Sequence, residues 1–267
     1  MIDIHSHAIF NVDNGATSLE QSIKMIKKAK EIGYEAICFT PNYNNDNNVI
    51  NRKELMDKII RIKKILLKNN IDMHLYLGEE VSIFPNLPDR INNIISLNDT
   101  RYVLISFRNE EDFSYLEELV YSLTSMDKVP IIAYPEKYDY FKKNPNKLKQ
   151  IVKDGALLQI NINSLIGEYG EESQELAKRL LEEDMVSFAA SDAHSVASYY
   201  KAKKGLDTLK EFVGEEKFHL LTQTNPCMAL SDSKIENKYN VKKEPFKIDK
   251  YVVKFFKTFP VLERMLW

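Results

Sequence analysis

The sequence predicts an α/β protein, a distorted (β/α)7 barrel, from three observations. Short apolar runs rich in β-branched and aromatic residues alternate along the chain with longer segments of helical spacing. Most of these runs are continuously apolar, which is typical of parallel strands covered on both faces. Seven such units fit within the 267 residues, and a full set of eight would leave one unit unplaced. An open doubly wound sheet is the alternative.

The seven predicted strands are short and leave room for a helix between them. In chain order they are Ile2–His5, Glu35–Thr40, Met73–Glu80, Tyr102–Phe107, Val129–Tyr134, Leu157–Asn161 and Val186–Ser191. The third ends in Glu79 and Glu80, whose side chains point to opposite faces of a strand. Only one of this pair can therefore face the mouth of the barrel.

The first predicted helix has a start signal and a stop signal. Thr17 and Glu20 stand at capping-box spacing ahead of an apolar face that includes Ile23 and Ile26, and Gly33 provides the stop. Five further helical patterns follow the later strands, over Arg52–Leu67, Glu110–Leu123, Lys147–Val152, Glu172–Glu182 and Tyr199–Phe212.

Composition excludes several classes of protein. The 37 Lys and Arg residues nearly balance the 39 Asp and Glu residues, a net charge of −2, so we expect no nucleic acid partner. Cys38 and Cys227 form no Cys-x-x-Cys motif, which argues against a disulfide framework or a thiolate zinc site. No run approaches the ~20 apolar residues of a membrane span, and the N-terminal residues do not resemble a secretory signal. We expect a cytoplasmic protein.

Two parts of the chain differ in composition. Residues 1–230 carry the barrel pattern, whereas residues 231–267 read as a basic and aromatic C-terminal tail. From Val241 to Trp267, seven Lys and Arg residues face three Asp and Glu residues, a net charge of +4. The tail either docks on the barrel or contacts a partner protein or the membrane surface. We predict the second, with peripheral contact at the inner face of the membrane.

Polar residues gather where the predicted strands end, which is where barrels of this kind build their sites. His5 and His7 form a His-x-His pair, and side chains at i and i+2 of an extended segment share a face, so both imidazoles can converge on one ion. With Glu80, Asp192 and His194 at matching strand ends, the ligand mix suits zinc, manganese or iron. A buried hydrogen-bond network without metal is the alternative. His74 and His219 lie outside this set, so we assign them no role in the site.

Six short motifs in this chain resemble, in order and spacing, those of the PHP-superfamily protein-tyrosine phosphatases of bacterial capsule and exopolysaccharide clusters. They are Met1-Ile-Asp-Ile-His-Ser-His7, Thr40-Pro-Asn-Tyr43, Gly78-Glu-Glu80-Val, Pro130-Ile-Ile-Ala-Tyr-Pro-Glu-Lys-Tyr138, Gly155-Ala-Leu-Leu-Gln-Ile-Asn161 and Ser191-Asp-Ala-His194. The resemblance covers about residues 1–230. It implies a PHP-type (β/α)7 barrel, a trinuclear metal centre usually credited with manganese, and dephosphorylation of the tyrosine-rich tail of a partner kinase that controls polysaccharide export.

Carried over residue by residue, the resemblance divides the site in two. The ligand positions that match the family are His5, His7, Glu80, Asp192 and His194. Four other ligand positions are altered, because the chain has Asn14, Asn42, Ser106 and Tyr134 where the family has Asp, His, Glu and His. Positions that carry phosphate-contacting arginines in the family have changed as well, to Ser82, Lys137 and Tyr199. We expect fewer than three ions, with one held by His5, His7, Glu80 and Asp192.

Three functions are consistent with this pattern. The first is a metal-dependent phosphatase acting on phosphotyrosine protein, in which Lys137 faces the phosphate and His194 or Asp192 handles the proton. The second is an inactive pseudophosphatase that still binds the kinase or its phosphorylated tail. The third is a hydrolase of small phosphomonoesters. We expect the first, with the tyrosine kinase as partner.

Overall fold

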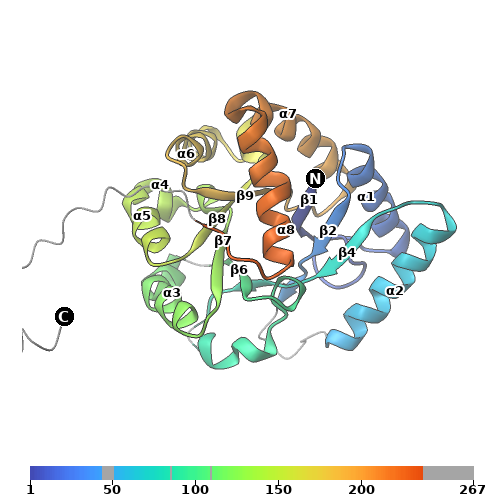
Figure 1. The fold of residues 1–267 in the computed structure, drawn as a ribbon, viewed down its shortest axis with the longest axis horizontal. Coiled ribbons are helices and arrows are strands. Elements are labelled where there is room, and N and C mark those ends of the chain that lie inside the picture. The colour runs from blue at the N-terminus through green and yellow to red at the C-terminus, as the bar shows by residue number, and fades with distance from the viewer. Residues whose placement is uncertain (44–50, 85, 109, 237–267) are drawn as a thin grey trace, which may run out of the picture.

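The computed structural model describes residues 1–43, 51–84, 86–108 and 110–236. Within them, nine strands alternate with helices that lie around the outside of the strands (Figure 1). The strands are β1 Ile2–Ser6, β2 Ala36–Phe39, β3 Asn42–Tyr43, β4 His74–Leu77, β5 Glu80–Ser82, β6 Tyr102–Ser106, β7 Val129–Ala133, β8 Leu157–Asn161 and β9 Val186–Ala190.

Eight α-helices and several single turns of other helical types connect these strands. The α-helices are α1 Leu19–Glu31, α2 Arg52–Lys68, α3 Leu116–Ser125, α4 Asp139–Lys143, α5 Pro145–Lys153, α6 Glu171–Glu182, α7 Val196–His219 and α8 Asn225–Leu230. The 3-10 turns are η1 Pro88–Asn93, η2 Leu97–Asp99, η3 Glu110–Tyr115, η4 Pro135–Lys137 and η5 Ile162–Ile166, and η6 Leu220–Thr224 is a π-turn.

All strand pairs are parallel and form two adjoining sheets. One has the order β1-β2-β4 and the other β3-β5-β6-β7-β8-β9. Between β2–β4 and β3–β5, the backbone bonds from Gly78 N to Phe39 O (2.8 Å) and from Glu80 N to Pro41 O (3.1 Å) continue the pairing of these two chain segments from one sheet to the next. On the other side an isolated bridge pairs Ser6 with Ala193, just beyond β9. The parallel α/β fold is therefore confirmed, although in the described part of the chain 3-10 turns and no α-helix connect β5 to β6.

The prediction of one uninterrupted third strand over Met73–Glu80 was wrong. The chain forms β4 and β5 instead, which belong to different sheets, and the neighbouring segment likewise forms β2 and the unpredicted β3. Both interruptions lie at the same level of the barrel. Pro41, which has no N–H to donate to a ladder, lies in the break between β2 and β3. Counted through these breaks, β2 with β3 and β4 with β5 are two of the seven barrel strands.

Several helix boundaries also differ from the prediction. The cap of α1 is Ser18, whose hydroxyl accepts from Gln21 N at 3.2 Å, one residue beyond the predicted Thr17 cap. Thr17 instead donates its backbone N–H to the Gln21 side chain at 3.0 Å, so a Gln completes the cap where Glu20 was expected. The predicted Glu110–Leu123 helix begins as the 3-10 turn η3, and α4 was not predicted. The final long helix, α7, begins at Val196 and is interrupted by a kink at Gly214 before it ends at His219.

The barrel interior and the layer under the helices are both apolar, so polar groups are confined to the ends of the strands. Ile4, Leu104, Ile131 and Phe188 belong to one buried cluster, and a larger cluster packs the helices onto the strands. Asp3 is a buried exception. Its carboxylate accepts from the backbone N–H of Ser191 and from the Tyr199 hydroxyl, both at 3.0 Å, which links β1 to the end of β9.

The described start of the expected tail, residues 231–236, packs on the barrel. Asp232 accepts from the backbone N–H of Arg101 at 2.8 Å, and Ile235 is buried with its N–H donating to the Tyr102 hydroxyl at 3.1 Å. The remainder of the tail lies outside the described residues, so its role stays a prediction. None of the helices in the described ranges is long and apolar enough to span a bilayer.

Candidate metal centre

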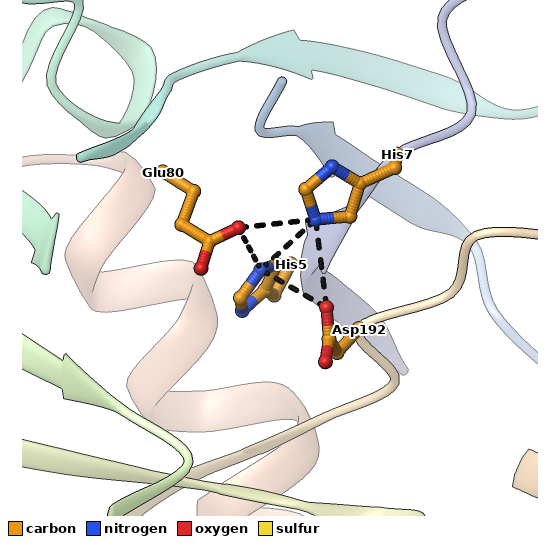
Figure 2. Close-up of side chains that lie close together, drawn as sticks. All are labelled: His5, His7, Glu80 and Asp192. Carbon is orange, nitrogen blue, oxygen red and sulfur yellow. Dashed lines mark hydrogen bonds and ion pairs between the residues drawn. The ribbon is translucent and has the colours of Figure 1, made fainter. Parts of the chain in front are cut away.

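Four buried side chains point toward one another at the C-terminal ends of the strands (Figure 2). His5 and His7 come from β1 and the residue after it, Glu80 opens β5, and Asp192 follows β9. Each offers one ligand atom, and all four atoms lie within 4.8 Å of one another. The His-x-His spacing and the predicted strand ends therefore bring together four of the five residues expected to bind metal.

The distances between these atoms fit a single ion. His5 Nε2 and His7 Nε2 are 3.3 Å apart, and each lies 3.3–3.4 Å from Glu80 Oε2 and 3.4 Å from Asp192 Oδ1. A tetrahedral site with ligand distances of about 2.1 Å has ligand atoms about 3.4 Å apart. Asp192 Oδ1 is buried without a hydrogen-bond partner, a costly arrangement that a cation would relieve. Two imidazoles and two carboxylates are also a donor set that zinc, manganese and iron accept.

The two histidines are oriented by residues that the sequence reasoning did not assign to the site. His5 Nδ1 lies 2.8 Å from Gln159 Oε1 on β8, and His7 Nδ1 lies 2.7 Å from Asp13 Oδ2. Both oxygens are acceptors, so each Nδ1 carries the proton and each Nε2 lone pair faces the cluster. Partners of this kind fix the tautomer and ring position of metal-binding histidines. Gln159 lies within residues 155–161, which resemble a family motif, and that resemblance was the one indication in the sequence that Gln159 belongs to the site.

Asp13 reaches His7 because the Asp13-Asn14-Gly15 loop folds tightly over that residue. Ala16 N donates to His7 O at 3.0 Å, and a Cβ at Gly15 would lie 1.9 Å from His7 O. Only glycine permits this approach. Asp13 is held in turn by the backbone N–H groups of Gly15 (2.9 Å) and Asn42 (3.1 Å), so its orientation depends on the loop.

Each carboxylate of the cluster presents one oxygen to the other ligands and has its second oxygen bound elsewhere. Asp192 Oδ2 accepts from Lys137 Nζ at 3.0 Å and from Asn161 Nδ2 at 3.1 Å. Glu80 Oε1 accepts from the Tyr134 hydroxyl. Burial and the adjacent Glu80 raise the pKa of Tyr134 well above its usual range, so it remains a phenol that donates. The second oxygen of each carboxylate is therefore already engaged by a hydrogen-bond donor.

The charges in the cluster stabilise one another. Burial alone would lower the pKa of His5 and His7, but the carboxylates around them raise it. Burial alone would raise the pKa of Glu80 and Asp192, but the two histidines, with Lys137 beside Asp192, lower it. Burial would likewise lower the pKa of Lys137, yet Asp192 raises it and keeps the ammonium charged. The two carboxylates are thus held ionised, and a cation at the shared point would take the place of the protons on the two Nε2 atoms.

Three of the four altered ligand positions, Asn14, Asn42 and Ser106, form hydrogen bonds with other altered positions. Asn42 Nδ2 donates to Asn14 Oδ1 at 3.2 Å, and the hydroxyls of Ser82 and Ser106 lie 3.3 Å apart. Arg108 Nε donates to Ser82 Oγ at 3.1 Å, so a guanidinium from the end of β6 approaches the altered Ser82 position. Tyr199, at another such position, is fully buried beneath the site.

His194 lies beside the four-residue cluster. Its ring stacks on His7 with centroids 3.9 Å apart, and its Nδ1 lies 3.0 Å from the backbone oxygen of Asp192. Burial and the neighbouring His7 lower its pKa. Glu79 points away from the cluster, as predicted for one member of the pair, and accepts from Ile95 N at 2.7 Å. His74 and His219 are exposed, and neither belongs to the group of converging ligand atoms that the described residues form, so the prediction that they lie outside the site agrees with the structure.

Comparison with known proteins places this chain. The family described as "Capsular polysaccharide synthesis, CpsB/CapC" matches residues 1–231. The chain belongs to this family. It is 33% identical to the tyrosine-protein phosphatase YwqE of Bacillus subtilis, over 84% of this chain and 89% of that protein. It is also 33% identical to the putative tyrosine-protein phosphatase CapC of Staphylococcus aureus, over 74% and 78% of the two chains.

A solved structure extends the similarity to three dimensions. It comes from work on YwqE of Bacillus subtilis and CpsB of Streptococcus pneumoniae, described there as metal-dependent tyrosine phosphatases. It superposes with a TM-score of 0.82 at 31% identity and covers 89% of this chain and 97% of that one. A histidinol phosphate phosphatase of Lactococcus lactis, at 16% identity and a TM-score of 0.54, shares the fold. The PHP-type fold inferred from the motifs is therefore confirmed.

Proposed function

We propose that this chain is a metal-dependent protein-tyrosine phosphatase that regulates polysaccharide biosynthesis. The observation that carries the proposal is the convergence of His5, His7, Glu80 and Asp192 on one point beside the Lys137 ammonium. The membership of the chain in the capsular polysaccharide family and its similarity to tyrosine-protein phosphatases support the choice of substrate.

In this proposal the four cluster residues hold one divalent ion, for which manganese is our choice. An ion bound there would polarise a phosphoryl oxygen and make a water molecule more acidic. Lys137 and Asn161 fix Asp192 through its outer oxygen, and Gln159 and Asp13 fix the histidines. The side chains are therefore held in place before substrate arrives, which reduces the reorganisation needed during reaction.

Two residues of this chain act on the substrate. Lys137 offers its ammonium to the phosphate, and at 23% exposure the side chain remains accessible. The overall reaction adds water to phosphorus, breaks the bond between phosphorus and the tyrosine oxygen, and returns a proton to that oxygen. His194 lies on the exposed side of His7 with 32% of its side chain accessible, and we assign it the proton transfer.

The proposed partner is a tyrosine kinase whose phosphorylated tail is the substrate. We place the encounter in the cytoplasm at the inner face of the membrane, with the basic and aromatic residues 241–267 as the contact. Deleting residues 241–267 tests the contact. We expect loss of co-sedimentation with anionic liposomes and unchanged turnover of a soluble phosphopeptide. A large fall in melting temperature without loss of lipid or kinase binding would contradict it.

The activity itself is tested with a phosphotyrosine peptide and added manganese, beside an Asp192→Ala variant. We expect phosphate release by the wild type and a loss of more than about 100-fold in the variant. Peptide binding without phosphate release would instead identify a pseudophosphatase. Faster hydrolysis of small phosphomonoesters than of the peptide would identify the third function considered above. Parallel arms with zinc and iron identify the metal.

A further inference from the structure

Tyr169 is an exposed aromatic ring attached to the edge of the cluster. Its hydroxyl accepts from Asn161 Nδ2 at 3.1 Å, and the same amide group donates to Asp192 Oδ2 at 3.1 Å. Lys137 Nζ lies 4.6 Å from the Tyr169 ring centroid and 3.0 Å from Asp192 Oδ2. Asn161 and Lys137 thus each connect the Tyr169 ring to Asp192, a proposed metal ligand, through a single side chain.

The segment that carries Tyr169 is shaped to present it. Gly167 and Gly170 bracket it with φ values of 77° and 90°, a conformation that only glycine adopts without strain. A Cβ at Gly170 would meet nothing within 4 Å, so backbone conformation and not crowding accounts for that glycine. Gly170 N donates to Gly167 O at 3.1 Å and closes the turn, and Glu168 is paired with Lys201 of α7. The ring is therefore held at a fixed position.

Tyr169 is more exposed than the other aromatic rings beside the cluster. It is 37% accessible, whereas Tyr134 and Tyr138 are only partly exposed and pack on each other with centroids 5.5 Å apart. Of these rings, Tyr169 is therefore the one with the most surface left for a ligand to contact. Its hydroxyl is tied to Asn161, and Lys137 Nζ lies over one face of the ring, so the exposed ring and the ammonium are neighbours.

The chemistry of an aryl phosphate matches this arrangement. When a phosphate oxygen accepts from Lys137, the aromatic ring of the substrate is only one ester oxygen away from the phosphorus. It must then lie near Lys137, where Tyr169 offers the exposed aromatic surface. Aromatic rings attract one another at centroid separations of about 4.5–7 Å. A phosphoserine side chain has no ring and gains nothing from this contact.

We propose that Tyr169 is a specificity-determining residue whose ring packs against the aromatic ring of the substrate phosphotyrosine. This inference rests on the proposed function, and it goes beyond it by naming the residue that distinguishes aryl from alkyl phosphates. Lys137 and the metal site serve both classes of ester, whereas Tyr169 serves only the aryl class.

The test compares Tyr169→Leu, Tyr169→Phe and the control Tyr121→Leu, which changes an exposed tyrosine on α3 that has no contact with the cluster. Each manganese-loaded protein is assayed on phosphotyrosine and phosphoserine peptides of the same sequence. We expect Tyr169→Leu to raise KM for the phosphotyrosine peptide and to lower the ratio of kcat/KM, phosphotyrosine over phosphoserine, about tenfold. Tyr169→Phe keeps the ring and should preserve that ratio within about threefold, as should Tyr121→Leu.

A binding measurement separates failure of this inference from failure of the proposed function. The peptide carries phosphonomethyl-phenylalanine, which cannot be hydrolysed, and its Kd is measured by calorimetry. If the wild type releases no phosphate but Tyr169→Leu still weakens peptide binding about tenfold, the activity fails and the role of Tyr169 stands. Equal Kd and equal KM in wild type and Tyr169→Leu would overturn it. A fall in kcat alone would overturn it too, because that result assigns Tyr169 to positioning Asn161 and Asp192.

Discussion

The two halves of the strand-end surface differ in how their polar side chains are satisfied. On one side, His5, His7, Glu80 and Asp192 aim ligand atoms at a common point, and their outer atoms are bound by neighbours. On the other side, neutral groups satisfy one another, as in the pair Asn14 and Asn42 and the pair Ser82 and Ser106. Both halves are carried by the same set of parallel strands.

This contrast shows that the fold places the side chains but their chemistry decides whether an ion can bind. Amide and hydroxyl groups both donate and accept, so adjacent pairs can complete each other without a cation. Ionised carboxylates only accept, and two of them close together require positive charge between them. The charged half therefore has the donor set that a cation requires, whereas the side chains of the neutral half satisfy one another by hydrogen bonds.

The largest effect is expected from removing a ligand in the charged half. His5→Ala or Asp192→Ala should lower metal-dependent activity by more than about 100-fold, because even residues that only support the ligands cost 10–100-fold. Ser106→Ala and Asn14→Ala, in the neutral half, should change it by less than about threefold. Steady-state assays at saturating manganese make the comparison, and circular dichroism checks that each variant is folded. Losses of similar size in both halves would break the distinction.

Glu136 sharpens the comparison, because it is a buried carboxylate outside the charged half. Its Oε1 accepts from Asn161 N and the Ser164 hydroxyl, and its Oε2 has no partner. Burial raises its pKa from 4.5 to about 7. A raised pKa gives stability that is complete below about pH 4.5 and is lost as the pH rises through about 7.

Glu136→Gln removes that titration. The wild type should therefore lose about 3 kcal/mol of unfolding free energy relative to Glu136→Gln between pH 4.5 and pH 8. Urea unfolding at several pH values measures the difference, with Glu172→Gln on the exposed start of α6 as control. If the difference in unfolding free energy between wild type and Glu136→Gln did not change with pH, Glu136 would be ionised over the whole range. Burial without a facing cation would then not be enough to neutralise this carboxylate.

A smaller effect is expected from the residues that orient the histidines. Gln159→Met and Asp13→Asn should each weaken manganese binding by about 10–100-fold while leaving the four ligands in place. Calorimetric titration of the metal measures this, and Gln150→Met, on the exposed surface of α5, is the control for Gln159→Met. Wild-type affinity in Gln159→Met would mean that packing alone orients His5.

The sequence predicted the charged half better than the residues that support it. His5 and His7 share a strand face by local geometry, and strand ends meet at one level of a barrel, so their convergence with Glu80 and Asp192 followed. Gln159 lies inside an apolar strand and meets His5 across 154 residues, a contact that no local pattern encodes. Tyr134 could be identified as an altered ligand, but its bond to Glu80 depends on the left-handed turn at the end of β7.

The central claim is that this chain holds one ion, in the charged half alone. Manganese bound to the full chain is counted by elemental analysis after removal of excess metal, and its electron paramagnetic resonance spectrum shows whether the ions are coupled. We predict one ion per wild-type chain with the six-line spectrum of isolated manganese, and a higher count only when Asn14→Asp, Asn42→His, Ser106→Glu and Tyr134→His are combined. Two or three coupled ions in the wild type would contradict the account.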